Sequence, residues 1–320
     1  MTVTCIISCA GYPKNIAVLQ RCIQSIVQAK KKGIKAIIVV TTNNPQHCIP
    51  KNLHINFLFV STKDSGFVQI NNIAVQKTIQ LDSDFYLIIN DDAEIKNDFF
   101  YELKKTAFLD KQRGDVYIPY IYEGHSKKLD SFGVEYFRTG YSKNSFSPKI
   151  ITSLASMSCL LIRTRFLKKM VSTYGFFLNP VLCWYLDDVE FSIRALAIGG
   201  IFSKCNNLIA YHLRTFTWGR KSYFVMYQSF RNLLWVIVLT WPRQFILKNA
   251  LRISYWQTIT AAYCFIKYSP WMYLKILLDT VQNWHTLQTG RKNILKQYTN
   301  ARVFSTIFSS LEIRHDRITF

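Results

Sequence analysis

A pair of carboxylates closes an apolar run in the stretch FYLIINDDAEI, residues 85–95. Asn90, Asp91 and Asp92 follow directly on hydrophobic and aromatic residues, so they are expected at the end of a buried strand. Buried negative charge is costly unless a cation lies opposite it. The chain has no Gly-x-Gly-x-x-Gly turn after its first strand and no P-loop Gly-Lys-Ser or Gly-Lys-Thr. A divalent cation on these carboxylates is therefore the device we expect for holding a phosphorylated ligand.

A second acidic group lies in WYLDDVEFSIRALAIGG, residues 184–200, where apolar residues recur at helical spacing. The helix is expected to begin near Asp187 or Asp188. Asp188 could then act as a general base, and the ordinary structural alternative is an N-cap aspartate favoured by the helix dipole. Glu190 and Arg194 stand at i,i+4, which favours a helix ion pair worth about 0.2–0.5 kcal/mol.

The elements that must position these residues follow an alternating pattern in the first ninety residues. The pattern predicts strands over 2–9, 35–42, 55–61 and 84–90, and helices over 16–32 and from Phe67 to about Gln80. This order indicates a largely parallel sheet covered by helices. Such sheets bind ligands beyond the carboxyl ends of their strands, so the segments SCAGYPKN, TTNN and NDDA are expected to meet at one edge.

Composition supports a folded intracellular protein. The chain has 320 residues, of which 49% are apolar, enough for a large core. None of its eight cysteines forms a C-x-x-C pair, so we expect reduced thiols. The N-terminal segment lacks a basic region followed by a long apolar run, which favours a cytoplasmic location.

The net charge of +21 is concentrated in the second half, because no Asp or Glu occurs between Glu190 and Asp279. Arg and Lys alternate there with Trp, Tyr and Phe, a combination typical of helices that lie in a membrane interface. The apolar run NLLWVIVLTWP is too short to span a bilayer. We therefore expect a nucleotide-binding domain over residues 1–220 and, over 221–320, a helical region that lies on an anionic membrane surface. A solvated basic face is the alternative.

The order of these motifs resembles the glycosyltransferase family 2 enzymes, and especially the rhamnosyltransferase-like members that build bacterial surface polysaccharides. The resemblance extends from about Thr2 to Trp241. It implies an α/β fold, with a GT-A-type nucleotide-binding sheet flanked by helices and followed by a basic, aromatic-rich helical C-terminal region.

The resemblance also implies roles for individual residues. Asp92 in NDDA matches the metal-binding carboxylate of the family's Asp-x-Asp motif, and His212 in IAYHLRTFTWG is the second candidate ligand, with Mg²⁺ or Mn²⁺ as the metal. A turn-forming aspartate and a hydrogen-bonded structural histidine are the alternatives. Nucleotide-sugar binding is expected from the loop after the first strand and from the later strand ends, namely Ser8, Ala10, Thr41, Asp64, Gly66, Asn71, Asn90 and Asp91.

The later motifs concern the acceptor side. Asp187 and Asp188 match the start of the family's Glu-Asp-x-Asp motif and are the expected catalytic pair. Arg220 could clamp the donor diphosphate or face phospholipid. The segment Arg231-Asn232 matches an Arg-Asn pair of the family.

Two positions depart from the family pattern. Thr41 stands where an Asp usually helps to read the nucleotide base, which leaves base recognition open. Asp187 stands where Glu is usual, a smaller change.

The resemblance implies inverting transfer of a sugar from a nucleotide-diphosphate donor to a saccharide or lipid-linked saccharide acceptor, at the inner face of the cell membrane. A basic nucleic-acid-binding protein is disfavoured, because the basic tract is strongly apolar and no RNA-binding or helix-turn-helix signature occurs. A sugar nucleotidyltransferase is disfavoured because SCAGYPKN is not a glycine-rich basic loop. A catalytically inactive, membrane-associated scaffold is a minor alternative, and the sequence leaves a homo-oligomer open.

Overall fold

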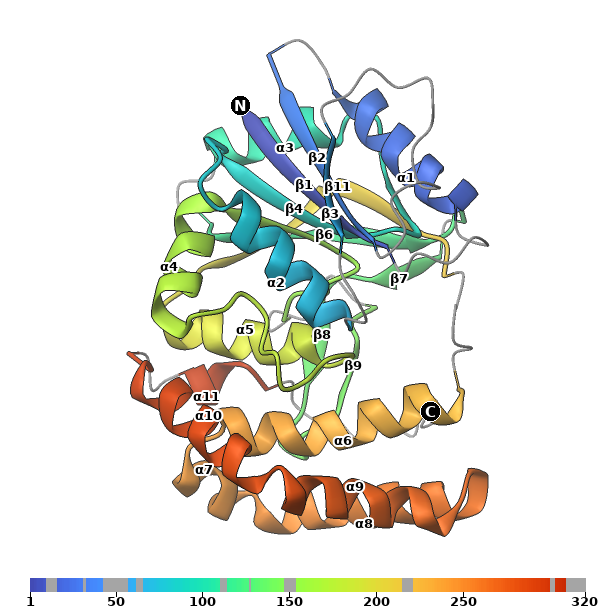
Figure 1. Ribbon diagram of the computed structural model, residues 1–320, viewed down its shortest axis with the longest axis vertical. Coiled ribbons are helices and arrows are strands. Elements are labelled where there is room, and N and C mark those ends of the chain that lie inside the picture. The colour runs from blue at the N-terminus through green and yellow to red at the C-terminus, as the bar shows by residue number, and fades with distance from the viewer. Residues whose placement is uncertain are drawn as a thin grey trace.

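The structure is a computed structural model that describes residues 1–9, 16–30, 33–42, 57–61, 66–109, 114–126, 128–146, 154–214, 221–299 and 303–308. Its centre is a nine-stranded mixed sheet in the order β3-β2-β1-β4-β10-β6-β11-β5, with β7 beside β6 (Figure 1). A separate hairpin pairs β8 with β9. The strands are β1 (Thr2–Ser8), β2 (Lys35–Thr42), β3 (Phe57–Ser61), β4 (Phe85–Asn90), β5 (Ala93–Ile95), β6 (Val116–Glu123), β7 (Leu129–Ser131), β8 (Val134–Tyr136), β9 (Ser142–Asn144), β10 (Cys159–Arg163) and β11 (Phe202–His212).

Helices cover both faces of this sheet and form further layers at one end (Figure 1). They are α1 (Ile16–Ala29), α2 (Phe67–Thr78), α3 (Phe99–Leu109), α4 (Thr164–Tyr174), α5 (Asp187–Ala197), α6 (Tyr223–Thr240), α7 (Arg243–Lys248), α8 (Ala250–Lys267), α9 (Pro270–Gln282), α10 (Trp284–Lys296) and α11 (Val303–Thr306). None of the helices in the described ranges is both long and apolar enough to cross a membrane.

The predicted strands and helices of the first ninety residues are all present, with ends that differ by a few residues. Strands β3, β2, β1 and β4 are parallel, as predicted. The parallel pairing ends at β10, which is antiparallel to both of its neighbours, β4 and β6.

Alternation along the central strands divides the core between the two faces of the sheet. Val3, Cys5 and Ile7 of β1 point to one face and pack with α1 and α3. Ile6 points to the other face, which α2, α4 and α5 cover. Successive side chains of a strand alternate in this way, so both faces of β1 are buried and its sequence is apolar throughout.

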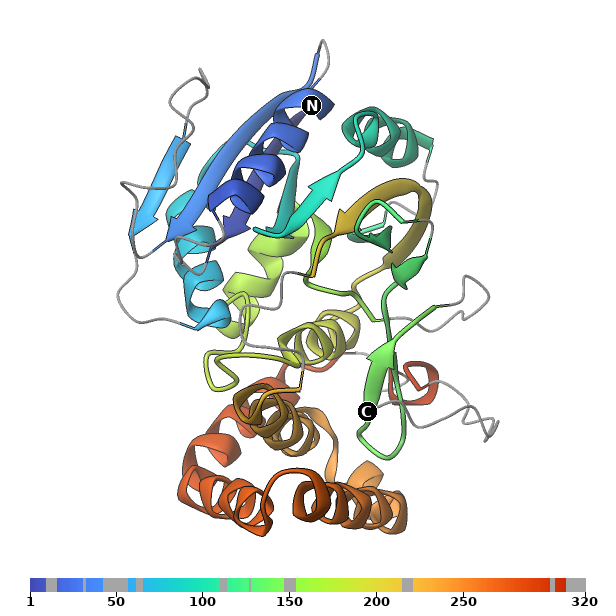
Figure 2. The same ribbon diagram turned by 90° about the vertical axis from the view of Figure 1, so that its right-hand side faces the viewer.

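The C-terminal helices form two further layers (Figure 2). The layer of α6, α10 and α11 packs on α5, and the outermost layer of α8 and α9 packs on α6. Val189 of α5 and Val236 of α6 belong to the same buried cluster, so one core joins residues on both sides of position 220. The division of the chain at residue 220 stays a prediction.

Candidate active site

The carboxyl ends of three neighbouring strands lie level with one another. Ser8, the last residue of β1, is paired in register with Thr41 of β2 and with Asn90 of β4. This confirms that the polar residues predicted at separate strand ends meet at one edge of the sheet, here called the carboxyl edge.

Several of these residues are committed to holding the edge together. The Ser8 hydroxyl donates to Asn71 Oδ1 at 2.9 Å, and Asn71, which is fully buried, donates to the Phe67 carbonyl at 2.8 Å. The hydroxyl of Thr41 is also fully buried and donates to the Ile7 carbonyl at 3.2 Å. The one O–H donor of Thr41 is therefore used within the sheet and is not offered to a nucleotide base. Asn90 differs, because its Oδ1 has no hydrogen-bond partner within the described ranges.

Asp92 and His212 come together because β5 pairs with β11. The pairing sets His212 opposite Ala93, and the Leu213 amide donates to the Asp92 carbonyl at 2.8 Å. His212 Nε2 then lies 3.1 Å from Asp92 Oδ1, and both side chains are largely buried. The two residues assigned to metal binding are therefore in direct contact.

A third carboxylate, which the sequence did not single out, completes this group. Asp130 of β7 is buried, accepts from His212 Nδ1 at 3.0 Å and pairs with the Arg214 guanidinium. Burial acts to raise the pKa of Asp130, but its hydrogen bonds with His212 and Arg214 outweigh burial and hold that pKa below its ordinary value. No motif surrounds Asp130, and it reaches His212 because β6 pairs with both β7 and β11.

The same contacts keep His212 charged. Burial acts to lower the pKa of His212, but the hydrogen bonds that His212 donates to Asp130 and Asp92 outweigh burial and raise that pKa to about 9. A metal ion on His212 Nε2 would have to displace the proton that Nε2 shares with Asp92, because only a neutral imidazole nitrogen can ligate a metal.

These residues fit a divalent cation with few protein ligands. Ligands next to one another around an octahedral Mg²⁺ lie about 3 Å apart, close to the spacing of Asp92 Oδ1 and His212 Nε2. Asp130 would orient the ring through Nδ1, as carboxylates beside metal-bound histidines do. In the described residues no cluster of three or more His, Cys, Asp or Glu side chains is arranged to hold a metal. A cation here would therefore depend on its bound phosphates for further ligands.

The second acidic group begins α5, as predicted. The helix starts at Asp187, and its N-cap is Leu186 rather than an aspartate, so the N-cap alternative is wrong. Asp187 and Asp188 lie in the first turn, where the helix dipole favours negative charge. Asp187 is buried, and its Oδ2 has no partner within the described part of the chain.

Burial changes the protonation of both aspartates. It raises the pKa of Asp188 to about 6, even though the amides of Val189 and Asp188 hydrogen-bond the carboxylate and act against the shift. Burial, followed by the adjacent Asp188 charge, raises the pKa of Asp187 well above its ordinary value. A carboxylate with a pKa about 6 is a stronger base than an exposed aspartate and still ionised at neutral pH.

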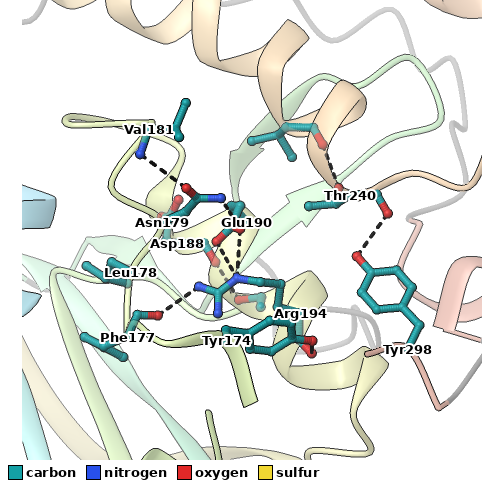
Figure 3. Close-up of polar contacts among 12 residues, drawn as sticks. Tyr174, Phe177, Leu178, Asn179, Val181, Asp188, Glu190, Arg194, Thr240 and Tyr298 are labelled. Atoms are coloured by element: carbon teal, nitrogen blue, oxygen red, sulfur yellow. Dashed lines mark hydrogen bonds and ion pairs between the residues drawn. The ribbon is translucent and has the colours of Figure 1, made fainter. Parts of the chain in front are cut away.

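The Glu190–Arg194 pair is not the ordinary surface ion pair that its spacing suggested. Both side chains are fully buried, and Arg194 Nε lies 2.8 and 2.9 Å from the two Glu190 oxygens (Figure 3). Asn179 Nδ2 donates to Glu190 at 2.9 Å, and Arg194 donates to the Phe177 carbonyl at 2.8 Å. The pair therefore ties α5 to the segment that precedes it, a role that an exposed pair worth a few tenths of a kcal/mol could not fill.

The 179–186 loop in front of the aspartates is strained. Cys183, Tyr185 and Leu186 all have φ near 60°, which non-glycine residues rarely adopt. Such a conformation persists only where its surroundings enforce it.

The surroundings of this loop are supplied by α6 and α2. The side-chain nitrogen of Asn232 lies 3.0, 2.6 and 2.9 Å from the carbonyl oxygens of Leu182, Trp184 and Tyr185. On the other side, a Cβ on Gly66 would lie 2.7 Å from the Cys183 carbonyl oxygen, so only glycine permits this approach of α2. Asn232 thus acts on Asp187 and Asp188 through the loop.

Replacing Asn232 by Ala should destabilise the chain by about 1–3 kcal/mol, because buried carbonyl oxygens of the strained loop lose their donor. The midpoint of denaturant unfolding measures this change. Asn293→Ala on the exposed face of α10 is the matched control, expected within about 0.5 kcal/mol of the parent chain. Equal midpoints for the two variants would contradict the role of Asn232.

Three of the residues expected to bind the nucleotide sugar, Ala10, Asp64 and Arg220, lie outside the described residues. Of the residues predicted to bind a metal or to act in catalysis, Asp92 and His212 form one group at the carboxyl edge. Asp187 and Asp188 form another, which the 179–186 loop joins to α2.

Comparison with known proteins identifies this architecture. No protein-family model and no curated protein matches the sequence. Among solved structures, GalNAc-T7 with UDP, GalNAc and Mn²⁺ matches with a TM-score of 0.56 and 15% identity, over 84% of this chain and 58% of that one. The chain thus spans less than two thirds of GalNAc-T7.

Two further structures agree over more of their length. S. aureus TarS 1-349 in complex with UDP-GlcNAc matches with a TM-score of 0.54 and 14% identity, over 93% of this chain and 89% of that one. The mannosyltransferase PcManGT from Pyrobaculum calidifontis, in complex with GDP-Man and Mn²⁺, matches with a TM-score of 0.51 and 10% identity, over 92% of this chain and 85% of that one. The chain has the GT-A fold.

Proposed function

We propose that this chain is an inverting glycosyltransferase that moves a sugar from a nucleotide-diphosphate donor to a saccharide acceptor. The observation that carries the proposal is the contact between Asp92 and His212 at the carboxyl edge, backed by Asp130. This contact joins residues that are far apart in the sequence. The solved structures of the same fold, which hold UDP, UDP-GlcNAc or GDP-Man, support a nucleotide-sugar donor.

In this proposal Asp92 and His212 hold Mg²⁺ or Mn²⁺, which when bound neutralises the charge of the leaving diphosphate. Asp130 keeps the His212 ring oriented through Nδ1, and Arg214 balances the charge of Asp130. Ser8, Asn90 and Asp91 line the same edge and would contact the donor.

The acceptor side of the reaction is assigned to α5. Asp188 accepts the proton of the acceptor hydroxyl at its carboxylate as that oxygen attacks the anomeric carbon. The bond from this carbon to the donor diphosphate breaks in the same step, the nucleoside diphosphate leaves, and the product has inverted configuration. Asp187 lies beside it in the first turn of α5 and is buried. The raised pKa of Asp188, about 6, suits a base that must be ionised at neutral pH and still take a proton.

We infer further that the enzyme is rhamnosyltransferase-like and acts in bacterial surface polysaccharide synthesis at the inner face of the cell membrane. The support is the order of motifs and the acid-free, basic tract after Glu190, which suits an acceptor carried on a lipid.

The test is thermal or denaturant unfolding with UDP, dTDP and GDP in turn, each with and without Mn²⁺. The matching nucleotide should stabilise the chain by about 2.7 kcal/mol at a hundredfold excess over its dissociation constant. Asp92→Ala should abolish the metal-dependent part, whereas Asp82→Ala, an exposed carboxylate before β4, should not. Failure of every nucleotide to stabilise the chain would overturn the proposed donor site.

A further inference from the structure

We propose that the outer face of α8 and α9 docks on the anionic surface of a phospholipid bilayer. These helices form the outermost layer of the molecule and pack on α6 (Figure 2). The inference concerns an attachment surface and does not depend on sugar transfer.

Helix α8 exposes a continuous apolar stripe. Leu251, Tyr255, Phe265 and Ile266 recur at helical spacing along one side, with Thr258 and Ala262 between them. Leu251 is 88% exposed and Ile266 73% exposed. The opposite side of α8 buries Trp256 and Cys264, so the helix is apolar on two faces, of which the structure covers one.

Helix α9 continues the stripe. Trp271, Leu274, Leu278 and Val281 lie on its outer side, with Trp271 71% exposed and Val281 72% exposed. Its inner side packs Met272 and Ile276 against α6. Together the two stripes make an apolar patch of a kind that marks an interaction site on a soluble protein.

The charges around this patch indicate what covers it. Arg252, Lys267 and Lys275 are exposed on the two helices. Asp279, the single carboxylate in α8 and α9, is turned toward α6, where it accepts from the Tyr227 hydroxyl and faces Arg231. The outer face is therefore apolar, aromatic and positive.

This combination fits phospholipid better than a second copy of the chain. A symmetric dimer would bring the same basic face against itself, with no carboxylates to balance it. Lipid phosphates supply negative charge at the depth of Lys and Arg, while Trp and Leu enter the acyl boundary. At the turn between the helices, Phe265, Ile266, Lys267 and Trp271 form such an anchor within seven residues.

The docked orientation would place the acidic group of α5 near the bilayer. Helix α6 joins the two regions, since Trp235 donates to Thr280 of α9 at 2.9 Å and Asn232 holds the 179–186 loop. At 8–10 Å for each helix layer, Asp188 would lie roughly 20 Å above the lipid head groups.

Vesicle flotation tests the proposal with the full chain. We expect binding to phosphatidylcholine vesicles that contain 30% phosphatidylglycerol, at about 0.1 M salt, and little binding to phosphatidylcholine alone. Leu274→Glu/Leu278→Glu and Lys267→Glu/Lys275→Glu should each weaken binding by about tenfold or more. Phe108→Glu is the matched control, because Phe108 is 88% exposed on α3, in another layer of the molecule.

Quenching of tryptophan fluorescence by brominated lipid gives a second readout, which compares the parent chain with Trp271→Phe. Quenching that the Trp271→Phe variant loses would support the proposal. Absence of vesicle binding by the parent chain would overturn it, and so would unchanged binding by the Leu274→Glu/Leu278→Glu variant. The face would instead be an interface with a second copy of the chain if the parent chain did not bind vesicles, formed a dimer in light scattering, and lost that dimer in the Leu274→Glu/Leu278→Glu variant. Vesicle binding is measured independently of sugar transfer, so a chain that failed the test of the proposed function could still bind vesicles through this face.

Discussion

Replacing Asp188 by Asn should lower the rate of sugar transfer by about 10²–10⁴-fold, the usual contribution of a general base. The same change should make the folded chain more stable. Burial raises the pKa of Asp188 to about 6, which means that the folded state disfavours the ionised carboxylate. Asn keeps the shape and removes the charge. Initial rates of transfer with the donor named by the unfolding screen, together with denaturant midpoints, measure the two effects.

The pH dependence gives an independent check on Asp188. A carboxylate with a raised folded pKa stabilises the fold fully below its unfolded pKa of about 4 and loses that contribution as pH rises through about 6. Stability of the parent chain should therefore fall over this window, and Asp188→Asn should flatten the fall. Transfer by the parent chain should rise over the same window as Asp188 ionises.

Asp82→Asn serves as the control for Asp188, since Asp82 is exposed. It should change neither the rate nor the slope of stability against pH. A variant Asp188→Asn that keeps full activity would remove Asp188 from the mechanism. A variant that loses both activity and stability would mean that the carboxylate is structural.

Replacing Arg194 by Met should destabilise the chain by about 3–5 kcal/mol, the largest stability effect that we expect from a single substitution. Met fills much of the space between the rings of Tyr174 and Phe176, which stack on the guanidinium at 4.7 and 4.8 Å. It leaves Glu190 as an unpaired buried carboxylate. The denaturant midpoint should fall accordingly, and activity should fall as the 179–186 loop loses its anchor.

A double variant separates charge from packing. Glu190→Leu/Arg194→Met removes both charges, so it should be more stable than Arg194→Met alone. Arg165→Met is the matched single control, because Arg165 is exposed and its contact with Asp115 is a surface pair at 3.3 Å. If Arg194→Met and Arg165→Met cost the same, the buried pair does not hold the loop.

The sequence by itself determined the elements and the edge where they meet. The apolar runs of β1, β2 and β4 and the helical spacing of α1 and α2 are local patterns, and parallel strands bring their carboxyl ends together whatever the side chains around them. Ser8, Asn90 and Asp92 could therefore be placed at one edge from residue types alone. The start of α5 at Asp187 follows from the same kind of local periodicity.

The tertiary structure decided which residues contact the candidate site residues and how deeply these residues are buried. The spacing of Glu190 and Arg194 is the same for an exposed pair as for a buried one, and only the packing of the 179–186 loop and of Tyr174 over α5 makes the pair internal. Asp130 reaches His212, and Asn232 reaches the loop before Asp187, across more than 40 residues of sequence. No local sequence pattern indicates such contacts, because they depend on where β7 and α6 pack in the tertiary structure.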